Sequence, residues 1–144
     1  MTTGHPHLEA SVVGAVLCAP DRYAQASFLT RDAFSDPGLS QLWALIERGV
    51  LEGKSVEPGP LTVRHPKEIA QLGGQSALTR MAAHGETILP GFDEAVEALY
   101  TEYQWSRIAT ISARLQAAVE SRDKTPDEIL SGLSDLSAKY LSGG

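Results

Sequence analysis

The sequence predicts an all-α protein. Apolar residues recur at spacings of three and four through most of the chain, helix-starting residues precede several of these runs, and no segment alternates as an exposed strand does. The 144 residues fit one domain, and 42% hydrophobic with 21% charged residues is typical of a globular protein. We expect a compact helical head of short helices over residues 1–91 and a long C-terminal helical hairpin over 92–144, as one structural domain spanning 6–141.

The first element is predicted to be a buried helix that starts at Pro6 and ends before Pro20. Proline fits the first helical turn, where its missing N–H is no loss. Gly14 stands inside this helix and indicates close packing against a neighbouring element. Cys18, on so apolar a helix, is expected in the core. The predicted core residues of this helix are Leu8, Val12, Val13, Val16 and Leu17.

A short helix is predicted in "PDRYAQASFL", and a longer one follows Asp36, which can cap it. The apolar stripe of the longer helix runs from Leu39 to Val50, and we place Leu42, Trp43 and Ile46 in the core. Gly53 is a plausible end for this helix.

Residues 55–66 are rich in proline and are predicted to form a loop. Two short helices are predicted over 66–72 and 75–84, separated by a tight turn at Gly73 and Gly74, and Leu78 of the second is assigned to the core.

The last third of the chain is the most regular. Residues 92–121 contain no Gly or Pro, which predicts one helix of about 45 Å. Thr125 and Glu128 form a capping box that starts the next helix, so the two helices make a hairpin. Two helices cannot bury both of their apolar stripes on each other. We predict that Tyr103, Ile111, Leu115 and Leu133 form an interface with a second copy or another partner.

No catalytic, metal or cofactor site is predicted. The G-K-S at residues 53–55 lacks the earlier glycine of a phosphate loop, the histidines lack metal-ligand spacing, and Asp93, Glu94 and Glu97 fit the favourable start of a helix. Four aromatic side chains could stack on bases: Trp43, Tyr100, Tyr103 and Trp105. Packing in the core or at an interface is the favoured interpretation for them. A net charge of −6 argues against broad nucleic-acid binding. The lone Cys18, and an opening run too short to span a membrane and without a basic leader, favour the cytoplasm.

The order of these elements resembles the N-terminal domain of the bacterial replicative DNA helicase, the DnaB family. The resemblance rests on "LEASVVGAVL" with its Val13–Gly14 pair, on "TRDAF" before the Trp43 helix, on Gly73–Gly74 with Ala77, Leu78 and Met81, on Tyr100 and Arg107 in the long helix, and on "TPDEIL". It extends from Pro6 to about Tyr140. The proline-rich loop at 56–66 departs from the family pattern.

The resemblance implies a non-catalytic domain, because the family's ATPase motor is a second domain and this chain ends at "LSGG". It further implies a ring collar in which hairpins pair between subunits, giving a dimer or a hexamer built as a trimer of dimers. The implied partners are the helicase-binding domain of primase and a helicase loader, with no membrane and little direct nucleic-acid binding.

The sequence leaves three other functions open. The chain could be a free-standing phage- or plasmid-type regulator that mimics this domain, a small helical enzyme with an unrecognised site, or a nucleic-acid-binding module.

Overall fold

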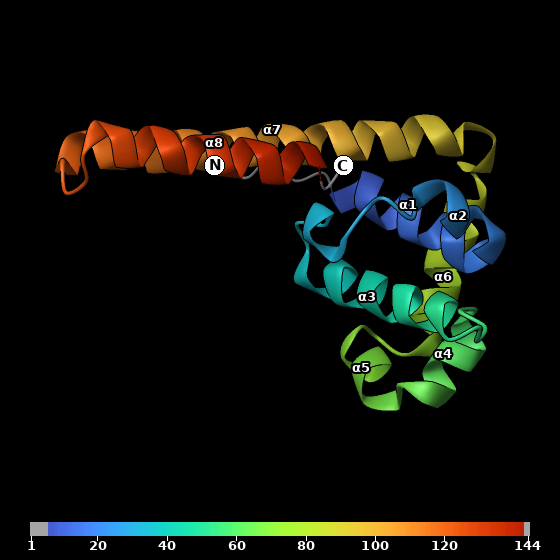
Figure 1. Cartoon of the computed structure of the whole chain (residues 1–144). Helices are drawn as coiled ribbons and strands as arrows, with labels where there is room; N and C mark the ends of the chain where they lie inside the picture. The colour runs from blue at the N-terminus through green and yellow to red at the C-terminus, as the bar shows by residue number, and fades with distance from the viewer. Residues whose placement is uncertain (1–5, 143–144) are drawn as a thin grey trace. The chain divides into compact units, whose positions relative to one another are not determined.

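The computed structural model describes residues 6–142, with side-chain exposure for residues 7–139, and every regular element in this range is a helix (Figure 1). The predicted all-α fold is confirmed. The elements are α1 (Pro6–Cys18), η1 (Pro20–Arg22), α2 (Tyr23–Ala26), η2 (Arg31–Ala33), α3 (Pro37–Leu51), α4 (Pro58–Arg64), α5 (Pro66–Gln71), α6 (Gln75–Glu86), η3 (Leu89–Gly91), α7 (Phe92–Ser121) and α8 (Pro126–Ser142).

The chain forms two compact units that divide between Tyr103 and Gln104. We call the described residues up to Tyr103 the head and residues 104–142 the hairpin. The long helix begins at Phe92, where the sequence predicts it. Its first turns nevertheless belong to the head, because Phe92, Val96 and Leu99 are buried in the head core. The division therefore falls later than the 91/92 boundary expected from the sequence.

The head core is built around Trp43 of α3, whose side chain is fully buried. The rings of Tyr23 and Phe34 lie 5.4 and 4.9 Å from the Trp43 ring, centroid to centroid. The indole Nε1–H of Trp43 donates a 2.9 Å hydrogen bond to the backbone oxygen of Leu29, which satisfies its one polar atom. Also buried are Val12, Val13, Val16, Leu17, Leu42, Ile46 and Leu78.

Helices α1 and α6 form the most extensive helix pair of the head, and they meet at two glycines. A Cβ added to Gly14 would lie 2.1 Å from the backbone oxygen of Met81. A Cβ added to Gly85 would lie 2.0 Å from the backbone nitrogen of Ala15. The two backbones are therefore in direct contact, which is the close packing that Gly14 predicts, and Gly85 is its unforeseen counterpart.

The start of α3 is held by two carboxylates. Asp36 is the N-cap, and its side chain accepts a 2.9 Å hydrogen bond from the Leu39 N–H, as predicted. Glu9 of α1 is 1% exposed and accepts hydrogen bonds from the Ser35 hydroxyl at 2.6 Å and the Asp36 N–H at 3.2 Å. The buried Glu9 thus ties α1 to the turn that starts α3.

Three local predictions are wrong. The proline-rich stretch forms a helix, α4, because Pro58 and Pro60 stand in its first turn, where backbone N–H groups have no intrahelical partner anyway. Cys18 is exposed: it is the last residue of α1 and lies on a different side of the helix from the buried valines. Leu8 is only half-buried against the core rather than inside it.

Candidate protein-interaction site

The hairpin turn is defined by a capped helix start and a strained helix end. The Thr125 hydroxyl accepts a 3.2 Å hydrogen bond from the Glu128 N–H, and the Glu128 carboxylate accepts one of 3.2 Å from the Thr125 N–H, which is the predicted capping box. At the end of α7, Arg122 has φ +53°, a conformation that favours glycine. Its N–H still donates a 2.9 Å hydrogen bond of helical spacing to the Ala118 oxygen. The left-handed conformation of Arg122 then turns the chain out of the helix.

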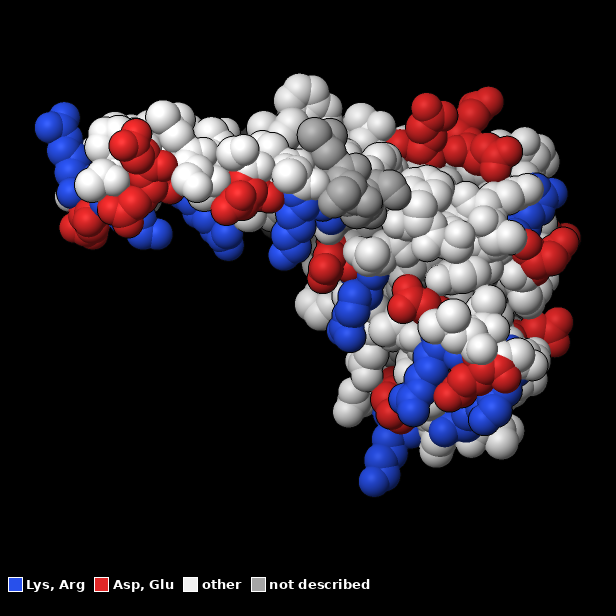
Figure 2. All heavy atoms as spheres, in the orientation of Figure 1, with Lys and Arg blue, Asp and Glu red and all other residues white. Residues whose placement is uncertain are grey.

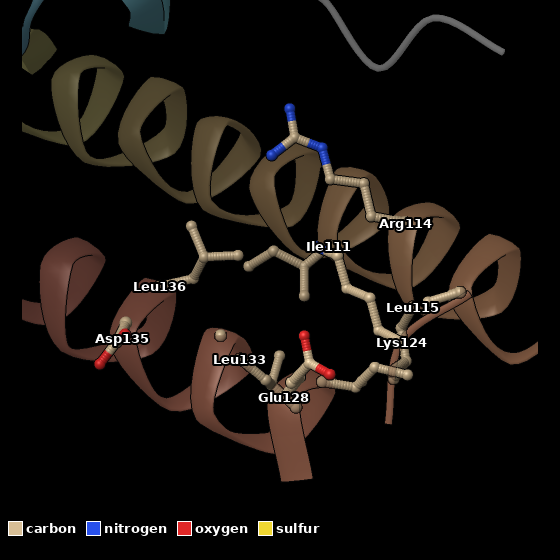
Figure 3. Close-up of a pocket in the computed structure, with 11 residues that line it drawn as sticks. Ile111, Arg114, Leu115, Lys124, Glu128, Leu133, Asp135 and Leu136 are labelled. Atoms are coloured by element: carbon tan, nitrogen blue, oxygen red, sulfur yellow. The ribbon is translucent and has the colours of Figure 1, made fainter. Parts of the chain in front are cut away.

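Helices α7 and α8 of the hairpin lie side by side and meet along an apolar seam. Ile111, Leu133 and Leu136 point toward one another between the two helices, and Arg114 points away from α8 (Figure 3). These residues line a groove of about 450 Å³, which we call the seam groove. No described side chain over residues 104–139 is fully buried, so the hairpin has a seam but no closed core.

The apolar face of α7 extends beyond the seam as an exposed stripe, and Leu115 belongs both to this stripe and to the lining of the seam groove. Trp105, Ile108, Leu115 and Val119 are 60%, 50%, 36% and 51% exposed, and their spacing places them along one side of the helix. Large apolar side chains aligned on one exposed face mark an interaction site rather than scattered surface residues. On α8, Leu130 adds another exposed side chain, at 62%.

The charge of the chain is divided unevenly between the two units. The hairpin has five Lys/Arg and five Asp/Glu, so the whole net charge of −6 belongs to residues 1–103. Figure 2 shows atoms of both signs spread among uncharged atoms over α7 and α8. A neutral unit with an apolar stripe has little long-range repulsion to overcome when it meets another protein surface.

The structure brings three of the four predicted interface residues, Ile111, Leu115 and Leu133, together in the seam groove, and places Tyr103 elsewhere. Tyr103 is half-buried and packs against the head core. Ile111 and Leu133 are half-buried in the seam, and Leu115 lines the same groove but is 36% exposed, so it also belongs to the exposed stripe. Sequence reasoning missed Trp105, Ile108, Val119 and Leu130 as exposed candidates, although a helical wheel of α7 places Trp105 and Ile108 on the side of Leu115 and Val119.

Other candidate sites find no support in the described part of the chain. Lys54 of the G-K-S follows a helix and lies 3.8 Å from the Glu52 carboxylate in an exposed ion pair. No three His, Cys, Asp or Glu side chains among the described residues are arranged to hold a metal ion. Trp43 is buried and unable to stack on a base. Within the described residues, the helices are each too short or too polar for a membrane span.

The sequence of residues 3–100 matches the family model of the DnaB-like helicase N terminal domain. The match covers more than half of the chain. The chain belongs to this family. The DnaB-like match includes the α1 helix, the Trp43 core and the first turns of α7, so the head is the N-terminal, non-motor domain of a DNA-replication helicase. The hairpin beyond residue 100 lies outside the match. No curated protein matches the chain significantly.

Proposed function

We propose that the chain is a non-catalytic assembly and docking domain of a replicative helicase, in which the hairpin joins copies into a ring collar and receives primase. The observation that carries this proposal is the exposed stripe of α7 on a hairpin without a core of its own. Such a face is stabilised when a second surface covers it. Family membership of the head supports the helicase context.

The expected product of self-association is an isologous dimer, with a hexamer as a trimer of dimers at high concentration. A standard interface buries about 1,600 Å² in total, and Trp105 and Ile108 supply its apolar centre. Apolar burial contributes about 25 cal/mol per Å², and the entropy lost on association offsets much of it. The affinity therefore depends on the few large side chains at the centre.

The test uses the residues that are exposed in the single chain. Trp105→Asp combined with Ile108→Asp places charges on the stripe while leaving the half-buried Ile111 in the seam unchanged. We expect light scattering to give a multiple of 15.4 kDa for the unmodified chain and a monomer for the double variant, with equal helix content by circular dichroism.

The matched control is Leu51→Asp with Val63→Asp, since these two head residues are 80% and 81% exposed and lie off the hairpin. The control is expected to keep the unmodified mass. A double stripe variant that also keeps it would contradict the proposal, as would an unmodified chain that is monomeric at every concentration. Primase docking is tested separately, by titrating the helicase-binding domain of primase into the labelled chain.

A further inference from the structure

We propose that the end of the hairpin next to its turn binds an acidic amphipathic helix of another protein. The site is a groove of about 660 Å³, here called the tip groove, formed by the apolar side chains of Leu115, Val119, Pro126 and Leu130 and by the cations Arg122 and Lys124. It shares a wall with the seam groove but opens around the turn. The proposal rests on the proposed function in one respect, since it assigns the docking role to one end of the same hairpin.

The tip groove is apolar and accessible. Leu115, Val119 and Leu130 are 36%, 51% and 62% exposed, so three large side chains from two helices surround one hollow. A groove between two antiparallel helices takes a third helix by the packing that joins the first two. The occupant therefore needs an apolar stripe of its own.

The charges around the tip groove determine which residues are favoured beside the apolar stripe of the bound helix. Arg122 and Lys124 line it, and no carboxylate does. Of the nearby carboxylates, Glu120 pairs with the Gln116 amide at 3.1 Å and Glu128 caps α8 through Thr125. Asp123 and Asp127 stand outside the lining. A helix with carboxylates beside its apolar stripe would meet both cations.

The backbone at Arg122 is a separate observation. Its φ of +53° is a left-handed conformation that is unfavourable for a residue with a side chain and that glycine adopts freely. A helix end of this kind is ordinarily occupied by glycine. An arginine held there at the expense of stability indicates a role for its side chain, and the tip groove supplies that role.

A second copy of the hairpin does not provide the required helix. The exposed stripe of its α7 has Arg107 and Arg114 beside it and no carboxylate between Tyr103 and Val119. Its α8 has carboxylates, but its Ile129, Leu133 and Leu136 are half-buried in the seam, and between residues 126 and 139 Leu130 is the one large apolar side chain that is exposed. A second hairpin is therefore a poor match, and the occupant that we propose is a helix of another protein.

The experiment uses three synthetic helical peptides with the full chain: one with an apolar stripe flanked by Glu, the same stripe flanked by Lys, and a scrambled Glu peptide. Fluorescence anisotropy gives affinities, and NMR shift mapping locates the contact. We expect the Glu-flanked peptide to shift the signals of Leu115, Val119 and Leu130 and to bind at least about tenfold more tightly than the other two. Equal affinities, or shifts confined to the head, would overturn the proposal.

Variants separate the roles of the two ends of the hairpin. Arg122→Glu with Lys124→Glu is expected to weaken the Glu-flanked peptide at least about tenfold and to leave the oligomeric mass unchanged. A changed mass would show that a second copy occupies the tip groove, and the proposal would be wrong. Arg122→Gly is expected to weaken the peptide without lowering the stability, whereas a purely structural Arg122 would leave peptide affinity unchanged.

The two proposals can fail independently. Trp105→Asp with Ile108→Asp alters residues outside the tip groove, so a mass that does not change there contradicts self-association only. Loss of peptide binding in the exposed head variant Leu51→Asp would show that the peptide does not recognise the tip groove, and would overturn the docking proposal.

Discussion

Replacing Gly14 with alanine is predicted to destabilise the head, although alanine is the better helix former. The added Cβ would lie 2.1 Å from the Met81 oxygen, and contacts of a Cβ with backbone atoms stay beyond 3.0 Å. Neither partner is a side-chain end that can turn away, so α1 and α6 must separate by about 1 Å. Overpacking of this kind costs about 1–3 kcal/mol, and the helix propensity of alanine returns about 1 kcal/mol.

The net loss is therefore expected to be up to about 2 kcal/mol, which lowers the Tm by up to about 8 °C for a chain of this size. Urea denaturation followed by circular dichroism measures it. Gly85→Ala should behave alike, because its Cβ would lie 2.0 Å from the Ala15 nitrogen. The double variant should lose less than the sum of the two, since one separation of the helices relieves both contacts.

Gly132→Ala in α8 is the matched control. Its Cβ would meet no atom within 4 Å, so the substitution should leave the stability unchanged or raise it by up to about 1 kcal/mol. A Gly14→Ala chain as stable as Gly132→Ala would refute the reasoning that the backbones of α1 and α6 touch.

Two further predictions concern buried polar groups of the head. Glu9→Ala should lower the free energy of unfolding by about 2–4 kcal/mol in urea denaturation, because it strands the Ser35 hydroxyl and the Asp36 N–H, whereas an unchanged midpoint would contradict the buried geometry. Burial, with a smaller contribution from the charge of Glu47, raises the pKa of Tyr23 above 10.0. The fold therefore favours the neutral phenol, and stability should fall as the pH rises above 10.0, less steeply in Tyr23→Phe; identical pH profiles would refute this.

Local signals in the sequence predicted much of the fold. Asp36 before Pro37 and the Thr125–Glu128 pair each mark a helix start by hydrogen bonds within four residues, and the structure contains those bonds. Gly73 and Gly74 have φ of +106° and +82°, so the turn between α5 and α6 uses the freedom of glycine.

Features that depend on tertiary contacts could not be predicted. Gly85 looks like an ordinary helix residue until α1 is packed against it, and Glu9 looks exposed until the start of α3 lies beside it. The proline content of residues 55–66 predicts a loop, because the sequence does not show that Pro58 and Pro60 fall in the first turn of a helix.

Of the residues predicted for the candidate site, Ile111, Leu115 and Leu133 line the seam groove, and the most exposed apolar residues of the hairpin were not among those predicted. The sequence indicates a hairpin with excess apolar surface, and the structure contains one. Which apolar residues face the seam depends on how α7 and α8 are rotated about their axes. That rotation places Ile111 and Leu133 inward and leaves Trp105 and Ile108 exposed.

No side chain over residues 104–139 is fully buried, so under the proposed self-association the order of the hairpin should depend on concentration. A segment with few buried contacts opens locally at lower free energy than the core, and its amide hydrogens exchange with solvent correspondingly faster. Any surface that binds only the closed hairpin stabilises it by mass action. Amide hydrogen exchange in α8 should then slow as the protein concentration rises, while exchange around Trp43 stays constant. The exchange rate in α8 would therefore measure how much of the hairpin is covered by a partner.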